Sequence, residues 1–266
     1  MNYYLGIDAG SSYIKLVLID EDEKIVSRRL VPRSADINAS CRSGYIELLE
    51  TCRLAESSVC GVIATGYGRK QVDFAEKAIT EITALALGGF KIDPGSEIII
   101  DIGGQDSKVV LIDTAGKVVD FAMNQKCSAG TGKFLEVTSA SLGVKIDELD
   151  RLSQKADKQL SLSSTCTVFA ESEIISHLAK GEKKENIIKA LFVAVAGQIQ
   201  GLFAQVSSGG RGKILYVGGV SQSHALKNEL SARLNRDMVV PEYPQHIGAY
   251  GAALYCKRSN EHQTNL

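Results

Sequence analysis

The chain has 266 residues, and its 30 Lys and Arg nearly balance 31 Asp and Glu, which gives a formal net charge of −1. Hydrophobic residues make up 44% and charged residues 23% of the chain, a composition typical of a globular protein that excludes intrinsic disorder. A net charge this close to zero argues against nucleic acid as a partner.

The first half of the chain predicts a β-meander followed by alternating helices and strands. Apolar runs separated by polar turns predict the strands, and helical spacing of apolar residues predicts the helices. The predicted strands are 3–8, 13–20, 24–30 and 59–65, and the predicted helices are 43–55 and 77–87. The turn Gly66-Tyr67-Gly68-Arg69 follows the fourth strand, and the sequence assigns it no role.

A second meander opens the second half, after the boundary at Pro94-Gly95. Its predicted strands are 97–101, 108–113 and 117–123. After it we expect helices at 132–142, 167–180, 184–206, 223–234 and 248–257, and short strands at 213–217 and 238–240. Alternating β and α elements after each meander indicate an α/β fold with mixed sheets.

The two meanders are copies of one unit. A shift of 93 residues aligns 8–26 with 101–119 without a gap, and nine of these nineteen pairs are identical. Asp8 falls on Asp101, Gly10 on Gly103 and Lys15 on Lys108. A duplicated unit of this size predicts two similar domains that face each other.

The first copy carries the turn Asp8-x-Gly10-Ser11-Ser12, with Lys15 on the following strand. Glycine in a tight turn lets backbone N–H groups point at a phosphate. Ser11 and Ser12 add hydroxyl donors, and Lys15 adds positive charge. Asp8 at a strand end can hold Mg²⁺, usually through water.

The second copy carries Asp101-x-Gly103-Gly104-Gln105-Asp106 at the same positions. Two facing turns of this kind would clamp the phosphates of a nucleotide. A third turn, Gly218-Gly219-Val220, follows a buried strand, and its backbone could lie against a flat nucleoside. Any one of them is also compatible with an ordinary hairpin turn, but the three together with the repeat favour a nucleotide site.

The segment Ala129-Gly130-Thr131-Gly132-Lys133 resembles a Walker A loop only superficially. That motif requires Gly-x-x-x-x-Gly-Lys-Ser/Thr, and here Cys127 replaces the first glycine and Phe134 the final hydroxyl residue. A glycine-rich turn ahead of a helix is still expected to be a good anion site.

We expect a cytoplasmic protein that does not act on a membrane. The first residues do not fit a signal peptide, because Asp8 interrupts the only apolar run. No uninterrupted apolar run approaches the roughly 18–20 residues of a membrane span. Disulfides are rare in the cytoplasm, so the six cysteines of the chain need another explanation.

Cys127 and Cys166 each lie just before a predicted helix, where the helix dipole favours a thiolate. Two thiolates are half of a cluster, so a two-fold dimer could hold one iron–sulfur cluster. Alternatively, both are small buried hydrophobes. The remaining cysteines are expected to be structural: Cys41 in a polar loop, Cys52 and Cys256 on helices, and Cys60 in an apolar strand.

Six segments of the chain together resemble a known family. They are LGIDAGSSYIKLVLID, TGYGR, DIGGQDSKVV, KCSAGTGKFLE, CTVFAESE and YVGGV. They are similar to the activator ATPases of the 2-hydroxyacyl-CoA dehydratases and to the ATP-binding subunits of benzoyl-CoA reductase, over residues from about 3 to 257. KCSAGTG and CTVFAESE are specific, whereas the phosphate turns alone would indicate only the actin, sugar kinase and Hsp70 superfamily.

The resemblance implies two ribonuclease-H-like domains with mixed sheets and an ATP cleft between them. Residues 1–94 with about 246–266 would form the first domain, and 95–245 the second, with the cluster ligands and the adenosine-binding turn. It also implies a homodimer with one [4Fe-4S] cluster held by Cys127 and Cys166 of each chain. ATP hydrolysis would drive one low-potential electron, taken from ferredoxin or flavodoxin, onto an iron–sulfur dehydratase, reductase or double-cubane cluster protein.

Residue roles follow from the same resemblance. Asp8 and Asp101 would hold Mg²⁺, and Gln105 or Asp106 would orient the attacking water. Phosphates would be bound by Gly10, Ser11, Ser12, Lys15, Gly103, Gly104 and Gln105. Gly130, Gly132 and Lys133 would link the nucleotide to the Cys127 loop, and Gly218, Gly219 and Val220 would border the adenosine.

Two other readings of the sequence stay open. One is a small-molecule kinase of the same superfamily, such as a sugar kinase without a cluster. The other is an actin-like filament protein. Neither gives a reason for the two cysteines ahead of helices.

Overall fold

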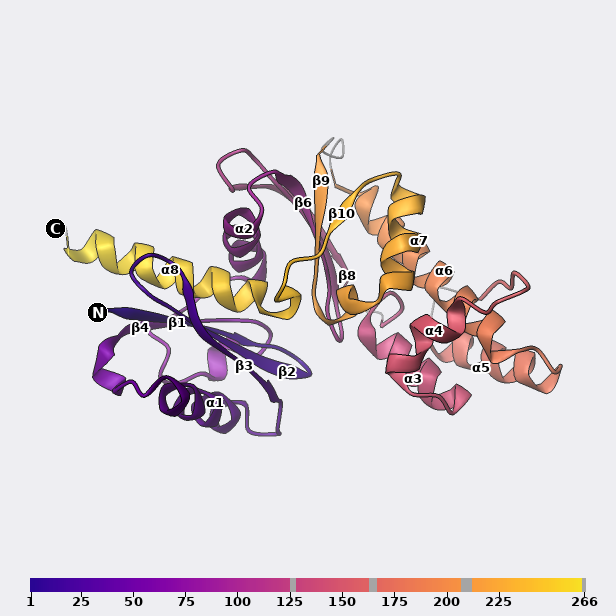
Figure 1. The fold of residues 1–266 in the computed structure, drawn as a ribbon, viewed down its shortest axis with the longest axis horizontal. Helices are drawn as coiled ribbons and strands as arrows, with labels where there is room; N and C mark the ends of the chain where they lie inside the picture. Colours follow the sequence, from indigo (N-terminus) through magenta and orange to yellow (C-terminus); the bar gives the residue numbers. More distant parts are fainter. Residues whose placement is uncertain (125–127, 163–166, 207–211, 265–266) are drawn as a thin grey trace. The chain divides into compact units, whose positions relative to one another are not determined.

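The computed structural model describes residues 1–124, 128–162, 167–206 and 212–264 (Figure 1). The chain divides into two compact units. Unit 1 comprises Met1–Ser96, Ile112–Val119 and Gln245–Leu266, and unit 2 comprises Glu97–Leu111 and Asp120–Pro244.

Unit 1 is built on a five-stranded mixed sheet with the order β3-β2-β1-β4-β5. Its strands are β1 (Tyr3–Ala9), β2 (Tyr13–Ile19), β3 (Ile25–Pro32), β4 (Val59–Thr65) and β5 (Lys77–Ala78). The meander β1-β2-β3 is antiparallel, whereas β4 runs parallel to β1 and β5 parallel to β4. The carboxyl ends of β1 and β4 therefore lie at the same edge of the sheet.

Helices cover both faces of this sheet. The helix α1 (Ile37–Cys52) packs on one face, and α2 (Glu81–Ile92) and α8 (Ile247–Thr264) lie on the other (Figure 1). The alternation of side chains along β1 explains the two layers, because Leu5 and Ile7 pack with α1 while Tyr4 packs with α8.

Unit 2 has a second mixed sheet with the order β10-β9-β6-β7-β8. Its strands are β6 (Ser96–Ile102), β7 (Ser107–Ile112), β8 (Val118–Asn124), β9 (Lys213–Val217) and β10 (Met238–Val239). Its helices are α3 (Gly132–Leu142), α4 (Leu149–Ser153), α5 (Thr167–Ala179), α6 (Lys184–Phe203) and α7 (His224–Leu234). These helices lie on one face of the sheet and form one hydrophobic core with it (Figure 1).

The helix α6 is long and apolar enough to pass a length and composition test for a membrane span. Its apolar character has a simpler explanation, because Ile187, Leu191, Val195 and Ile199 are fully buried in the core of unit 2. It is the only such helix in the part of the chain that the structure describes.

The 93-residue repeat is confirmed in the strand register. Asp8 pairs with Lys15 across β1 and β2, and Asp101 pairs with Lys108 across β6 and β7. Every pair from Leu5↔Leu18 to Ala9↔Ile14 recurs 93 residues later. The order β3-β2-β1-β4-β5 recurs as β8-β7-β6-β9-β10, so the predicted α/β class with two mixed sheets is confirmed.

Several predicted helices have different bounds: α8 extends to Thr264 and not 257, α6 ends at Phe203 and not 206, and two others begin elsewhere. α1 begins at Ile37 and not at 43, because Asp36 caps it by accepting the N–H of Ala39 at 2.9 Å. The predicted helix at 77–87 is wrong at its start, because Lys77 and Ala78 pair with β4 as a strand. α2 begins only after the cap Thr80.

Candidate functional site

The turn between β1 and β2 offers two free backbone donors. Nζ of Lys15 lies 3.1 Å from Oδ2 of Asp8, and these side chains are 20% and 16% exposed. The N–H of Gly10 donates to the Asp8 carbonyl at 3.0 Å and is therefore occupied. The N–H groups of Ser11 and Ser12 make no hydrogen bond within the described chain, so they are available to a phosphate.

Asp8 sits where several elements of unit 1 meet. It pairs in register with Thr65 at the end of β4. The next residue, Gly66, has φ +91, and a Cβ there would lie 2.4 Å from Oδ1 of Asp8. Gly68 donates its N–H to the Ala9 carbonyl at 2.8 Å. The Gly66–Arg69 turn, which had no role in the sequence, is thus packed directly on the candidate phosphate turn.

The turn between β6 and β7 has the same place in the repeat but a different charge arrangement and a different backbone hydrogen bond. Lys108 is 1% exposed, and its Nζ lies 2.8 Å from Oδ2 of Asp106 and 3.6 Å from Oδ2 of Asp101. The N–H of Gly103 donates to the Asp106 carbonyl at 2.9 Å. The N–H groups of Gly104 and Gln105 form no hydrogen bond to any described residue. The Gln105 side chain is exposed, whereas the Asp106 carboxylate is held by Lys108.

The third turn, after β9, packs on the second one. Gly218 has φ +88, and a Cβ there would lie 2.4 Å from Oδ1 of Asp101. This contact repeats the contact of Gly66 with Asp8 in unit 1. Gly219 is exposed and Val220 is buried, and Gly218 is the residue of this turn that lies against Asp101.

The glycine-rich segment before α3 is bonded to the same turn. The N–H groups of Gly132 and Lys133 donate to the carbonyls of Gly103 and Gly104 at 2.9 and 2.8 Å. These two donors are therefore not available to an anion, contrary to the expectation for a glycine-rich turn ahead of a helix. The carbonyl of Gly130 accepts the Ser107 hydroxyl at 2.6 Å. The segment thus connects the second phosphate turn to the chain that follows Cys127.

The two cysteines singled out as cluster ligands, Cys127 and Cys166, lie outside the described residues. Among the residues with described positions, no group of three or more His, Cys, Asp or Glu side chains is arranged to hold a metal ion.

The other four cysteines do not all match the sequence expectation. Cys41 is not in a polar loop but buried in α1, and Cys60 is exposed and not in the core. Cys256 is buried, and Cys52 is half-buried. Burial raises the pKa of Cys41 and of Cys256 to about 12, so these two thiols stay protonated at neutral pH.

Sequence patterns missed two residues beside the first turn. Arg33, just after β3, donates from Nη1 to the Ser11 carbonyl at 3.0 Å. His246, just before α8, is 8% exposed, and burial lowers its pKa to about 4, with charges from Arg28 and Lys15 acting in the same direction. It is therefore neutral at pH 7. Neither residue belongs to a motif, and both reach the turn only through the tertiary fold.

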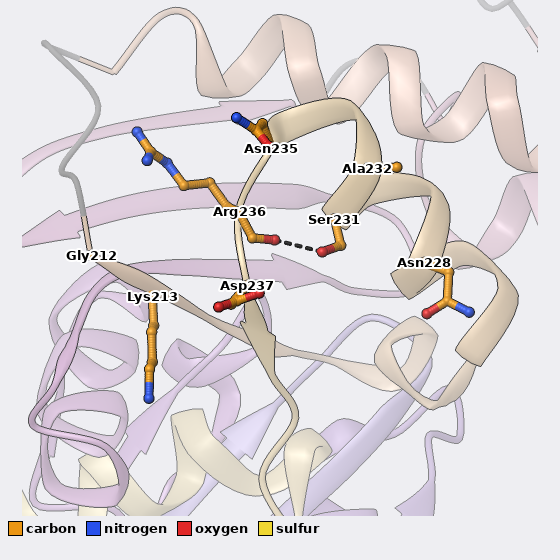
Figure 2. Close-up of a pocket in the computed structure, with 8 residues that line it drawn as sticks. All are labelled: Gly212, Lys213, Asn228, Ser231, Ala232, Asn235, Arg236 and Asp237. Carbon is orange, nitrogen blue, oxygen red and sulfur yellow. Dashed lines mark hydrogen bonds between the residues drawn. The ribbon is translucent and has the colours of Figure 1, made fainter.

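A polar pocket of about 520 Å³ lies elsewhere in unit 2 (Figure 2). Its lining includes Lys213, Asn228, Ser231 and Arg236, and the Ser231 hydroxyl donates to the Arg236 carbonyl at 2.6 Å. The pocket borders the Lys213 end of β9, whereas Gly218 follows the other end. Five strand residues separate the two by about 16 Å, so this pocket is distinct from the candidate phosphate turns.

Comparison with known proteins extends over nearly the whole chain. Residues 5–256 match the BadF/BadG/BcrA/BcrD ATPase family. The (R)-2-hydroxyglutaryl-CoA dehydratase activating ATPase of Acidaminococcus fermentans is 39% identical, over 95% of this chain and 96% of that protein. A subunit of the benzoyl-CoA reductase of Thauera aromatica is 30% identical, over 96% of this chain and 93% of that one.

Comparison with solved structures points to the same family. The activator of the 2-hydroxyisocaproyl-CoA dehydratase from Clostridium difficile, solved with bound ADPNP, is 36% identical. It superimposes with a TM-score of 0.91 over 99% of this chain and 98% of that one. A glucokinase of the ROK family from Streptomyces griseus, at 14% identity and a TM-score of 0.57, shares the fold alone.

Proposed function

The chain belongs to the BadF/BadG/BcrA/BcrD ATPase family, and from this premise we propose that it is an ATP-dependent reductive activator. In this proposal a homodimer with one [4Fe-4S] cluster couples ATP binding and hydrolysis to the transfer of one low-potential electron. The observation that carries the proposal is the pair of hydrogen bonds from Gly132 and Lys133 to the second phosphate turn. They join a nucleotide turn to the segment that contains Cys127.

The nucleotide is ATP, or ADP after hydrolysis, together with Mg²⁺, for which Asp8 and Asp101 are the ligands through water. Gly218, Gly219 and Val220 border the adenosine. The phosphate-binding residues are Gly10, Ser11, Ser12, Lys15, Gly103, Gly104 and Gln105. The unbonded N–H groups of Ser11, Ser12, Gly104 and Gln105 support this assignment, because such groups in tight turns are common phosphate ligands. Gly10 and Gly103 contribute shape, since their own N–H groups are already bonded.

Gln105 is the residue that orients the attacking water in this proposal. Its side chain is exposed at the turn, whereas the Asp106 carboxylate is engaged by Lys108 at 2.8 Å. A carboxylate that is already paired with a lysine is less available to position a water. Asp106 is therefore assigned to holding Lys108 and not to the water.

Coupling runs through α3. A displacement of Gly103 and Gly104 on nucleotide binding or hydrolysis moves the first turn of α3 with them, and with it the segment joined to Cys127. The chain would thus exchange between two conformations, before and after this displacement. A nucleotide can shift the equilibrium between them only as far as it binds the two with different affinity. Gly130, Gly132 and Lys133 are accordingly linking residues.

The cluster is held by Cys127 and Cys166 of each chain, and it supplies a centre that stores and releases one electron. The chain can tune the reduction potential of such a centre through its burial and through hydrogen bonds to its sulfur atoms. The acceptor is an iron–sulfur dehydratase, a benzoyl-CoA reductase-like enzyme or a double-cubane cluster protein, and the donor is ferredoxin or flavodoxin. The activator works with them in the cytoplasm.

Anaerobic reconstitution with iron and sulfide tests the proposal. We expect about four irons per dimer, and their loss in Cys127→Ala or Cys166→Ala. The matched controls are Cys52→Ser and Cys60→Ser, which change cysteines outside the proposed ligand set and should keep the full iron content. An iron-free protein that phosphorylates a sugar would instead support the kinase reading.

A further inference from the structure

Two arginines bracket the first phosphate turn. Arg33 donates from Nη1 to the Ser11 carbonyl at 3.0 Å, and its backbone N–H donates to the Ser12 carbonyl at 3.1 Å. Arg69 donates from Nη1 to the Gly66 carbonyl at 3.0 Å. Because Gly66 packs against Asp8, both guanidinium groups are fixed to backbone that forms or touches this turn.

The charges around the turn do not cancel. Asp8 and Lys15 neutralise each other at 3.1 Å. Within the described chain, neither Arg33 nor Arg69 forms an ion pair with a carboxylate, whereas Arg42, also in unit 1, pairs with Asp73 at 2.8 Å. The Arg33 charge therefore lies at the Ser11–Ser12 backbone, and the Arg69 charge is fixed on the neighbouring turn whose Gly66 packs against Asp8.

Holding the backbone of the turn uses only part of the hydrogen-bonding capacity of these two side chains. Each guanidinium group has five N–H donors, of which the bonded carbonyl uses one, and both side chains are half-buried. Guanidinium groups match the geometry of phosphate oxygens, with which they form paired hydrogen bonds.

We propose that Arg33 and Arg69 bind the polyphosphate of the nucleotide at the Ser11–Ser12 turn. This inference rests on the proposed nucleotide site and adds to it two residues outside the recurring Asp-x-Gly motif. It also gives the Gly66–Arg69 turn a function, which is to hold Arg69 beside Asp8 and Ala9.

The test is calorimetric titration of the reconstituted protein with MgADPNP and, separately, with adenosine. We expect Arg33→Gln and Arg69→Gln each to weaken MgADPNP binding about tenfold or more, as for a lost charge-assisted hydrogen bond. Adenosine binding should not change, because adenosine carries no phosphate. Arg42→Gln is the matched control and should bind MgADPNP like the unmodified protein.

Chemical modification of the unmodified protein gives a test that does not depend on the variants folding. Phenylglyoxal reacts with accessible arginines, and peptide mass spectrometry locates them. MgADPNP should protect Arg33 and Arg69 and leave Arg42 reactive, while adenosine should protect none of them. Equal modification of Arg33 and Arg69 with and without MgADPNP would overturn the inference, as would Gln variants that lose adenosine and MgADPNP binding equally. If the unmodified protein fails to bind MgADPNP at all, the proposed nucleotide site itself is wrong.

Discussion

The two phosphate-turn hairpins share one register but manage their charges differently. In unit 1, Lys15 balances the single carboxylate of Asp8, and both side chains are partly exposed. In unit 2, Lys108 is buried between Asp101 and Asp106. The repeat aligns Asp106 with Tyr13, so one position changes the sum of the charges from zero to −1. The duplicated backbone sets where Asp and Lys stand, and the neighbouring residues set the local charge.

The largest expected effect is that of removing Lys108. Lys108→Met leaves two carboxylates without their counter-charge at a buried position, and we expect a loss of about 3–5 kcal/mol in the free energy of unfolding. Lys15→Met breaks a partly exposed pair and should cost about 1 kcal/mol or less. Urea denaturation measures both, and Lys24→Met is the control because Lys24 is highly exposed. Equal losses for Lys15 and Lys108 would remove the distinction between the hairpins.

The second prediction concerns a feature that both hairpins share, a glycine packed against the aspartate. Gly66 and Gly218 both have positive φ and both leave no room for a Cβ beside an aspartate. We expect Gly66→Ala and Gly218→Ala to cost about 2–3 kcal/mol each, from backbone strain and the clash together. Gly181 is the control, since its φ is +78 but a Cβ there would meet nothing within 4 Å. Gly181→Ala should therefore cost only about 1 kcal/mol, and a larger loss there would contradict the role of the clash.

The third effect belongs to the first hairpin, beside which His246 is buried. Its pKa is lowered to about 4 from an ordinary value near 6.5. The unfolded chain therefore binds a proton on acidification before the folded chain does, and stability should fall between about pH 6.5 and pH 4 by about 1–3 kcal/mol. Thermal unfolding across this range should show a shallower pH dependence in His246→Phe. An unchanged dependence in the variant would contradict the assignment.

The smallest effect separates catalysis from binding. Gln105 occupies the position that Ser12 occupies in the first copy. Gln105→Ala should lower the kcat of ATP hydrolysis about tenfold or more with little change in MgADPNP affinity, because a group that orients the attacking water acts mainly on the chemical step. Ser12→Ala should instead act mainly on affinity. Hydrolysis rates and calorimetry decide this, and equal losses of kcat and affinity in Gln105→Ala would speak against a water-orienting role.

Much of the fold could be predicted from the sequence, because most helices and strands show a local pattern of apolar and turn residues. α3, β4 and β9 have the predicted bounds 132–142, 59–65 and 213–217. The start of α1 was missed because Ile37 is the one large apolar side chain buried in its first two turns, beside the small Ser40 and Cys41, and this gives little helical signal. β5 was read as helix because its two residues become a strand only by pairing with β4.

The candidate site was predictable to the extent that the repeat carries it. Asp8, Lys15 and Asp101 were found because the aspartate and lysine positions recur at one spacing. Arg33 and His246 were not, because they approach the turn through the third strand of the meander and the start of α8. The donors of α3 were misjudged for a related reason, since only the folded chain brings the carbonyls of Gly103 and Gly104 to them.

The central claim is that a nucleotide acts on the cluster through the chain that follows the second hairpin. The direct measurement is the rate at which an iron chelator removes iron from the anaerobically reconstituted protein, with and without MgADPNP. We expect a rate that changes on adding MgADPNP and does not change on adding adenosine. The same rate under all three conditions, in a protein that binds MgADPNP and holds its iron, would contradict it.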